Sequence, residues 1–311
     1  MNSFQEASAR QRIDALFDDF FEFLPPAKAW TSPHLPLLNA PVSFDDGVII
    51  GRATMAGKRV YVAAQEGGFM GGAVGEIHGA KLVGLMRRAV QQKPSAVILL
   101  AESGGVRLHE ANAGLIAVSE VMRAVFEVRA AGIPVLVLIG GSNGCFGGIG
   151  IIARCANWII MSEEARLAMS GPEVIETANG AEEFDSRDRA LVWRTTGGKH
   201  RYLLGDCMDL VADDVHAFSA AMHKALAKLL RKDTANMAAL CLEEIVAEHT
   251  LLTQRLNEFG NLVEPMEIWR KMGVAEPEGV AMLEAHEFVA LVAQQRKAST
   301  PHVESQEKAA Q

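Results

Sequence analysis

The sequence lacks the cysteine pairs that mark structural zinc sites and disulfide frameworks. Its four cysteines are scattered along 311 residues, at Cys145, Cys155, Cys207 and Cys241, and no two of them form a CxxC pair. This distribution argues against a zinc ribbon and against a small secreted fold held by disulfides. We therefore expect a protein with no metal site.

Long apolar runs and long basic runs are also missing. No stretch approaches the roughly eighteen uninterrupted apolar residues of a transmembrane helix. The first residues, MNSFQEASARQRIDALF, do not have the charged and then apolar pattern of a signal peptide. The net charge is −8, which disfavours nucleic acid as a partner. We expect a cytoplasmic protein that binds neither membrane nor nucleic acid.

Two glycine pairs are the most informative feature that is present. The apolar strands predicted at Ala96–Leu100 and Pro134–Ile139 each lead to such a pair, Gly104–Gly105 and Gly147–Gly148, followed by a helical pattern. Glycines at a strand-to-helix corner leave backbone N–H groups free of a neighbouring Cβ, and the helix dipole adds positive potential there. Each corner is suited to an anion or a developing oxyanion.

The alternation of strands and helices predicts an α/β protein, and the almost uniformly apolar strands predict a sheet covered on both faces. We expect three parts: an N-terminal helix and extended arm over 1–43, a core over 44–232, and a helical C-terminal region with a disordered tail over 233–311. Within the first part, the apolar stripe predicts a helix over 1–24. Further predicted elements are strands over 47–54, 58–65, 158–161, 166–169 and 206–210, helices over 75–92, 112–131, 148–155, 177–193 and 213–230, and a polar loop over 195–200.

Several side chains near the glycines have both a chemical and a structural interpretation. Ser103 could act as a nucleophile with His109 as its base, but no G-x-S-x-G elbow surrounds it, and capping of the turn is favoured. Cys145 precedes a helix N-terminus, yet a buried inert thiol is the commoner outcome. Arg107 could meet a substrate carboxylate or phosphate, or form an ion pair with Glu110 or Glu102. Single ionisable groups nearby are weaker acid–base candidates: Glu66, Glu76, His78 and Glu102.

Nucleotide binding has little support. The run Gly148-Ile149-Gly150-Ile151-Ile152-Ala153 fits G-x-G-x-x-A, but seven residues separate it from Gly140 at the end of the preceding strand. In a dinucleotide site the first glycine follows the strand almost directly. No G-x-x-x-x-G-K-[ST] loop is present.

Three segments together resemble the carboxyltransferases of biotin-dependent enzymes. Residues 102–110, ESGGVRLHE, resemble the S-G-G-A-R-x-x-E signature; residues 140–153 resemble the family's second glycine corner; and residues 168–175, AMSGPEVI, resemble the F-A-G-P-R-V-I element. The likeness spans 44–214, with the motifs in the family's order. It implies a crotonase-like (ClpP/crotonase) fold, a spiral of ββα units with helical N-terminal and C-terminal extensions. It also implies a site completed by a second, homologous subunit.

Within the family, FMGGAVGEIHGAKLVGLMRRA and the missing zinc ribbon make the chain similar to beta subunits of malonate decarboxylases. The resemblance implies a carboxy-lyase that converts malonyl-S-acyl carrier protein to the acetyl form and CO₂. It implies no cofactor on this chain itself, the thioester being carried on the phosphopantetheine-type arm of a carrier subunit. The implied partners are a homologous gamma subunit, the acyl carrier protein and an acyl-carrier transferase subunit.

The resemblance also assigns roles to the glycine corners. Gly147 and Gly148 would hold the thioester oxyanion of the enolate, Gly104 and Gly105 would line the wall facing pantetheine, and Arg107 would support that wall. Two alternatives stay open: a carboxyltransferase that passes the carboxyl group to biotin on a carrier, and a non-catalytic half whose partner carries the chemistry.

Overall fold

The structure, a computed structural model, describes residues 2–28, 30–37, 39, 46–110, 112–231 and 242–299. A seven-stranded sheet forms its centre, with the strands in sequence order from edge to edge. Strands β1 to β3 are antiparallel neighbours, and β3 to β7 are parallel. The strands are β1 (Asp18–Glu22), β2 (Val48–Met55), β3 (Lys58–Gln65), β4 (Ala96–Ala101), β5 (Val135–Ile139), β6 (Trp158–Ser162) and β7 (Asp209–Val211).

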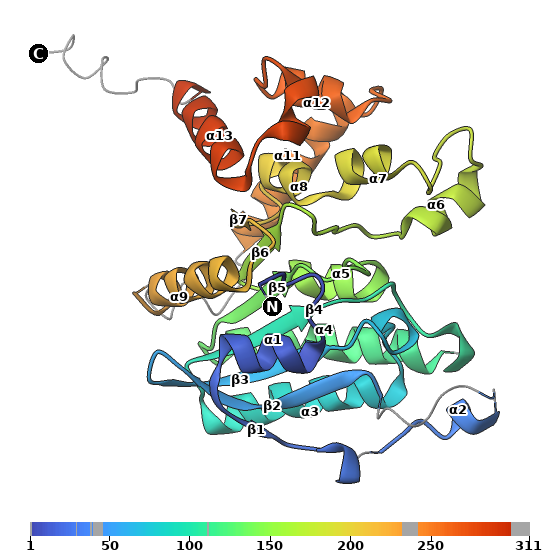
Figure 1. Cartoon of the computed structure of the whole chain (residues 1–311), viewed down its shortest axis with the longest axis vertical. Coiled ribbons are helices and arrows are strands. Elements are labelled where there is room, and N and C mark those ends of the chain that lie inside the picture. Colours follow the sequence, from blue (N-terminus) through green and yellow to red (C-terminus); the bar gives the residue numbers. More distant parts are fainter. Residues whose placement is uncertain are drawn as a thin grey trace, which may run out of the picture.

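Helices connect the parallel strands, because a parallel neighbour can be reached only by a crossover (Figure 1). The α-helices are α1 (Ala9–Leu16), α2 (His34–Leu37), α3 (Glu76–Gln92), α4 (Ala113–Ala130), α5 (Gly147–Arg154), α6 (Pro172–Asn179), α7 (Arg189–Thr196), α8 (Gly198–Leu204), α9 (Val215–Arg231), α11 (Leu242–Phe259), α12 (Pro265–Lys271) and α13 (Ala285–Ser299). Short 3₁₀ turns are η1 (Pro26–Lys28), η2 (Met70–Gly72), η3 (Leu108–Glu110) and η4 (Pro277–Met282).

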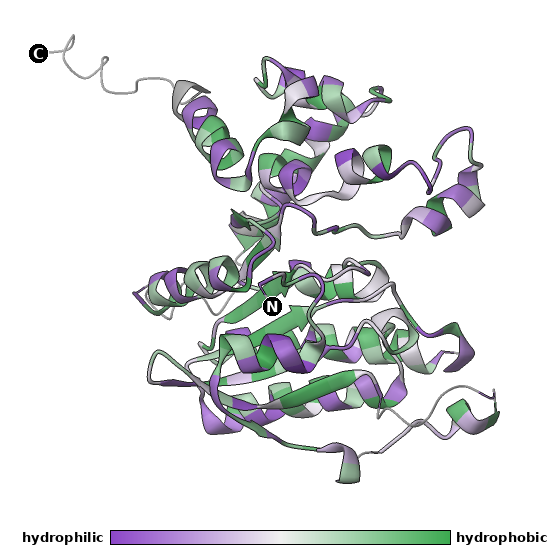
Figure 2. Ribbon diagram, in the orientation of Figure 1, coloured by the Kyte–Doolittle hydropathy of each residue, from purple (hydrophilic) through white to green (hydrophobic). Residues whose placement is uncertain are grey.

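Both faces of the sheet are covered, as the apolar strands predict. Ile98 and Leu100 of β4 belong to a core shared with α1 and α9. Val97 and Leu99 belong to the core shared with α3, α4 and α5. Figure 2 shows the hydrophobic central strands between these helical layers. The α/β class and the main strand–helix units of the core are confirmed.

The prediction of one N-terminal helix over 1–24 is right only for Ala9–Leu16. Helix α1 ends there, and the following residues form β1, an edge strand in which Phe21 pairs with Arg52 of β2. Gly51 makes the pairing possible, because a Cβ at that position would lie 2.5 Å from the ring of Phe20. Sheet pairing therefore overrides a phenylalanine pattern that also fits a helix.

The C-terminal part of the core also differs from prediction. The helix expected over 177–193 is interrupted between α6 and α7, and 166–169 contributes only isolated bridges at Arg166 and Leu167. The polar loop expected over 195–200 is instead the end of α7 and the start of α8. Lys199 is buried there and donates to the carbonyls of Val280, at 3.1 Å, and Leu283. This polar segment thus forms hydrogen bonds with the C-terminal region instead of facing solvent.

Candidate active site

The two glycine pairs meet at the carboxyl edge of the parallel strands. A β-carbon built on Gly147 would lie 3.1 Å from the α-carbon of Gly105. Isolated bridges join Ser103 to Cys145 and Cys145 to Leu167, so the segments after β4, β5 and β6 run beside one another. Two corners that lie apart in the sequence are therefore adjacent in the fold.

The second corner presents a backbone donor at the start of α5. Gly147 has a φ of +60°, and its N–H donates to the carbonyl of Met169 at 3.1 Å. The N–H of Gly148, in the first turn of α5, has no acceptor among the described residues, and Phe146 gives the helix no side-chain cap. A free N–H at a helix N-terminus attracts negative charge.

The first corner has an open surface, but its backbone N–H groups already donate to acceptors within the chain. Gly104 N–H donates to the carbonyl of Gly71 at 2.8 Å, and Gly105 N–H to Ser103 Oγ at 3.1 Å. Gly105 has a φ of +141°, and a β-carbon there would meet nothing within 4 Å. Ser103 thus caps the turn, as favoured from the sequence. Its hydroxyl makes no hydrogen bond to the exposed His109 within the described chain.

Arg107 lies inside the protein rather than at the open surface. Its guanidinium donates to Glu110 Oε1 at 3.2 Å and to the carbonyl of Asp46, and it lies over the ring of Phe69. The side chain is only 2% exposed. Of the two interpretations of Arg107, the structure shows the ion pair with Glu110. We therefore treat Arg107 as a positioning residue for the loop that carries Gly104 and Gly105.

Glu102, a candidate acid–base group, is held by partners that the sequence did not suggest. Its Oε2 accepts from Arg12 Nη1 at 2.5 Å, and its Oε1 accepts from the side chain and backbone of Asn143 at 3.0 and 3.2 Å. Its own backbone N–H donates to Gln65 Oε1. Glu102 therefore joins α1 to the loops after β4 and β5.

Two further candidates are buried in uncharged form. Burial raises the pKa of the Cys145 thiol, so this cysteine is neither a thiolate nor a nucleophile at neutral pH. Burial, with the charge of Arg107 as a second cause, lowers the pKa of His78 well below its usual value. His78 contacts the side chain of Gln65 and the carbonyl of Asp46. The buried-thiol interpretation holds for Cys145, and His78 packs as a neutral imidazole.

Apolar side chains surround the paired corners and face outward. Leu108, just after the first pair, is 83% exposed, and Met169, which accepts from Gly147, is 73% exposed. Leu115, Ile116 and Val174 are also largely exposed. A group of exposed large apolar side chains marks a contact surface. The described chain thus presents an apolar contact surface next to the two corners.

Beside the corner lies a cleft whose charged lining residues are Arg166, Arg189, Lys199, Glu163 and Glu164, so that basic residues outnumber acidic ones by one. Its volume is about 720 Å³, and Ser142, Arg166 and Arg189 are among its lining residues. Arg166 donates to the carbonyl of Ser142, and the charge of Glu173 also acts on it. Such a cleft suits a phosphate group. No cluster of three or more potential metal ligands, and no helix able to cross a membrane, occurs in the part of the chain that the structure describes.

The sequence of this chain is similar to that of known proteins. The family model described as carboxyl transferase domain matches residues 5–251. The chain is 40% identical to malonyl-S-ACP:biotin-protein carboxyltransferase MADC of Malonomonas rubra, over 93% of this chain and 95% of that protein.

Two solved structures from Pseudomonas are similar in fold. One is a malonate decarboxylase hetero-tetramer in complex with malonate, with a TM-score of 0.69 and 39% identity over 73% of this chain and 84% of that chain. The other is the malonate decarboxylase MdcD-MdcE hetero-dimer, with a TM-score of 0.60 and 35% identity over 73% and 89%. These likenesses confirm the carboxyltransferase-type, crotonase-like fold predicted from the three motifs.

Proposed function

The chain belongs to the carboxyl transferase domain family, and from that premise we propose that it is the beta-type half of a malonyl-thioester decarboxylase. Its substrate is a malonyl group on an acyl carrier protein, and its products are the acetyl thioester and CO₂. The observation that supports the proposal is the contact between Gly105 and Gly147, next to which the N–H of Gly148 has no acceptor among the described residues.

The chemistry needs an oxyanion site more than a strong base. When the bond between the α-carbon and the carboxylate breaks, its electron pair forms an enolate whose negative charge rests on the thioester oxygen. Gly148 N–H and the N-terminus of α5 stabilise that charge in the transition state more than in the substrate. One such donor contributes about 3 kcal/mol, or a factor of about a hundred in rate. Gly147 becomes a second donor when it exchanges its bond to Met169 for the oxyanion.

The apolar surroundings act on the other end of the substrate. The malonyl carboxylate is strongly hydrated, whereas the enolate is less localised, so a site lined by Leu108 and Met169 favours loss of CO₂ once water is excluded. An arginine at that carboxylate would stabilise the substrate instead, and Arg107 is turned inward. A proton from water, or from an acid on the second subunit, then completes the acetyl group.

The carrier's phosphopantetheine-type arm delivers the thioester. We assign the open face of Gly105, with Gly104, to the wall along which this arm lies. We assign the cleft with Arg166 and Arg189 to its phosphate. A homologous gamma-type subunit closes the site over the apolar surface, and an acyl-carrier transferase subunit reloads the carrier.

A second function has a specific observation in its favour. The 40% identical relative is named a carboxyltransferase that acts on malonyl-S-ACP and a biotin protein. The same oxyanion corner would serve that reaction, with biotin in place of a proton as the acceptor. The two functions differ only after the enolate has formed.

The deciding experiment measures decarboxylation of a malonyl thioester by this chain co-expressed with its neighbouring subunits, without added biotin, in the presence and in the absence of excess avidin. Acetyl thioester and CO₂ formed in the presence of avidin support the biotin-independent lyase. Activity that avidin abolishes identifies the carboxyltransferase. No turnover of malonyl thioesters in either condition would overturn both.

A further inference from the structure

The carboxylate of Glu102 lies between the two loops that carry the glycine pairs. Glu102 directly precedes Ser103 in the first loop, and its Oε1 accepts from the backbone N–H and the side-chain amide of Asn143 in the second loop, at 3.2 and 3.0 Å. The hydroxyl of Ser142 donates to the same oxygen at 3.3 Å. One side chain of the first loop therefore holds the segment that leads to the second glycine pair.

The two residues that donate to Glu102 are the centre of a tight turn. The N–H of Gly144 donates to the carbonyl of Gly141 at 3.1 Å and closes this turn. Gly147, the first residue of α5, follows only three residues after Gly144. The position of the turn over 141–144 therefore affects where α5 begins, and with it where the N–H groups of the second glycine pair lie.

Two further glycines leave room for this carboxylate. A β-carbon on Gly141 would lie 2.2 Å from Cδ of Glu102. A β-carbon on Gly67 would lie 2.3 Å from both Oε1 of Glu102 and Nδ2 of Asn143. Neither glycine has a positive φ, so the backbone conformation does not require glycine at these positions. The space around Glu102 requires it instead, because two separate segments approach the carboxylate closely.

Arg12 of α1 pairs with the other oxygen of the carboxylate and is itself held in place. Its Nη1 donates to Glu102 Oε2 at 2.5 Å. Its Nε donates to the carbonyl of Phe4 at 2.8 Å, and its Nη2 donates to the carbonyl of Gln5 at 3.1 Å. Hydrogen bonds to a charged acceptor are shorter and stronger than those between neutral groups. Since both of its oxygens are engaged inside the protein, Glu102 acts on the loops rather than as an acid or base towards the substrate.

We propose that Glu102 is a positioning residue: it fixes the turn over 141–144 and thereby the second glycine corner relative to the first. The inference rests on the proposed function, in which the second corner holds the oxyanion. A shift of about 1 Å in a group that stabilises a transition state can lower the rate about a hundredfold. The wall assigned to the pantetheine arm belongs to the first corner, so a displaced turn lowers kcat much more than it raises KM.

Asn143→Asp tests this link while leaving the ion pair and the glycines unchanged. The new side chain has the same shape, but it replaces the amide donor by a second carboxylate, which repels that of Glu102. The matched control is Asn179→Asp, because the amide of Asn179 donates to Glu183 Oε1 at 2.9 Å on the exposed end of α6. The control makes the same chemical change away from the two glycine pairs.

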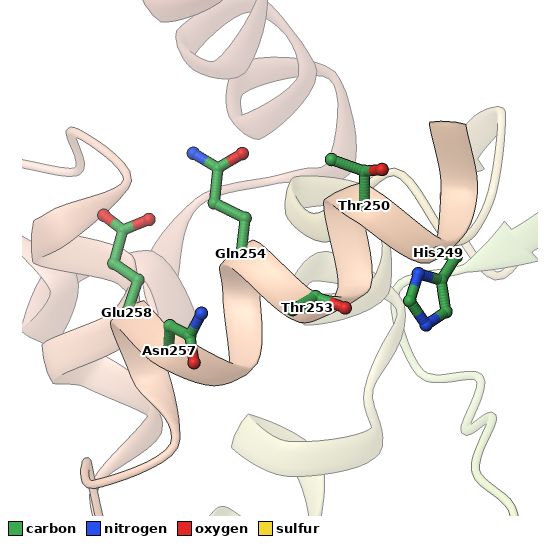
Figure 3. Close-up of a pocket in the computed structure, with 6 residues that line it drawn as sticks. All are labelled: His249, Thr250, Thr253, Gln254, Asn257 and Glu258. Atoms are coloured by element: carbon green, nitrogen blue, oxygen red, sulfur yellow. The ribbon is translucent and has the colours of Figure 1, made fainter. Parts of the chain in front are cut away.

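A second control separates the added charge from the broken hydrogen bond. Asn257→Asp places the same charge on the exposed polar side of α11, where Figure 3 shows Asn257 together with Gln254. Asn257 makes no side-chain hydrogen bond within the part of the chain that the structure describes. Any effect of net charge alone on assembly or on the carrier appears in this variant as well.

The first measurement is the steady-state kinetics of malonyl-thioester decarboxylation by the co-expressed complexes. We expect kcat to fall about tenfold or more in Asn143→Asp with KM within about twofold of wild type, and both controls to change kcat less than about twofold. Two adjacent carboxylates share a proton as the pH falls, so the ratio of variant to wild-type kcat should rise from about pH 8 towards about pH 5. Equal kcat losses in the controls, an effect on KM alone, or a ratio that does not change with pH would overturn the proposal.

The second measurement needs no turnover. Hydrogen exchange of the backbone amides over 141–148, followed by mass spectrometry of the complexes, should be faster in Asn143→Asp than in wild type and unchanged in the two controls. Unchanged exchange over 141–148 in Asn143→Asp would overturn the positioning role even in an active enzyme. An inactive wild-type complex with the expected exchange pattern would overturn the proposed function and leave the hold of Glu102 on the turn standing. If Asn143→Asp fails to fold, Asn143→Ala, which removes the donor without adding a charge, is compared by exchange in the same way.

Discussion

The α-carbon of Gly105 lies 3.1 Å from the position that a β-carbon on Gly147 would occupy. The loops after β4 and β5 touch at this point, and a β-carbon on Gly147 would push them apart by a few tenths of an ångström. Gly147 also has a φ of +60°, which L-residues rarely adopt. Close approach and backbone conformation thus both require glycine at the point where the oxyanion site is proposed.

We expect Gly147→Ala to lower the rate of malonyl-thioester decarboxylation at least tenfold, because its methyl group separates the two corners. The matched control is Gly57→Ala in the β2–β3 hairpin, where φ is +71° and a β-carbon meets nothing within 4 Å. Both variants carry a similar backbone strain of about 1–2 kcal/mol. Steady-state kinetics of the co-expressed complexes, with melting temperatures, separate the two effects. Equal activity losses would remove the special role of the contact.

The free N–H of Gly148 can be tested by comparing two variants that both place a β-carbon at this position. A β-carbon on Gly148 would lie 2.3 Å from Cγ2 of Val118, so both test variants carry Val118→Ala to make room. Gly148→Ala keeps the N–H, whereas Gly148→Pro removes it at a first-turn position where a helix tolerates proline. We expect the proline variant to be about a hundredfold slower in kcat than the alanine variant. Comparable kcat values would exclude this N–H as an oxyanion donor.

The sequence predicts those parts of the fold whose signal is local. β4 and β5 are continuous apolar runs because both faces of a parallel strand are buried, and each leads to its glycine pair. Partners far apart in the chain leave no local signal. Arg12 looks like one polar residue in an amphipathic helix, and nothing near it in the sequence indicates that it will pair with Glu102, 90 residues away.

The direction in which a side chain points is equally hard to predict from the sequence. Arg107 follows a glycine pair whether it points to a substrate or to Glu110, and only the fold places Asp46 and Phe69 around it. Likewise Lys199 and His200 read as polar loop residues, but helices from the end of the chain cover them. Sequence patterns misplace such polar residues because the segments that bury them are distant in the chain.

The ion pair between Arg12 and Glu102 is buried on both sides, with side chains 1% and 5% exposed. Glu102→Gln would leave the guanidinium charged and unpaired, which costs about 3–5 kcal/mol of unfolding free energy. Arg12→Met combined with Glu102→Gln should recover much of that loss, because no buried charge remains. Chemical denaturation of wild type, both single variants and the double variant measures the coupling. Additive losses would show that the pair contributes nothing as a pair.

The buried contact between Trp269 and His200 predicts a response to acid. The indole N–H donates to His200 Nδ1 at 2.9 Å, which requires a neutral imidazole. Burial chiefly, and then the charge of Arg201, lowers the pKa of His200 to about 3, although Asp206 acts in the opposite direction. In the unfolded chain the pKa is about 6.5.

Between these two pKa values the unfolded chain binds a proton that the native His200 does not, so stability falls as the pH falls from about 6.5 towards about 3. The expected slope from this residue is about 1.4 kcal/mol per pH unit. His200→Gln keeps an acceptor for the indole but does not titrate, so its unfolding free energy should depend less on pH by that amount. His78 titrates in the same direction in both proteins, and its contribution cancels in the comparison. Denaturation followed by tryptophan emission at several pH values gives both slopes, and parallel slopes would show that His200 is protonated in the native protein.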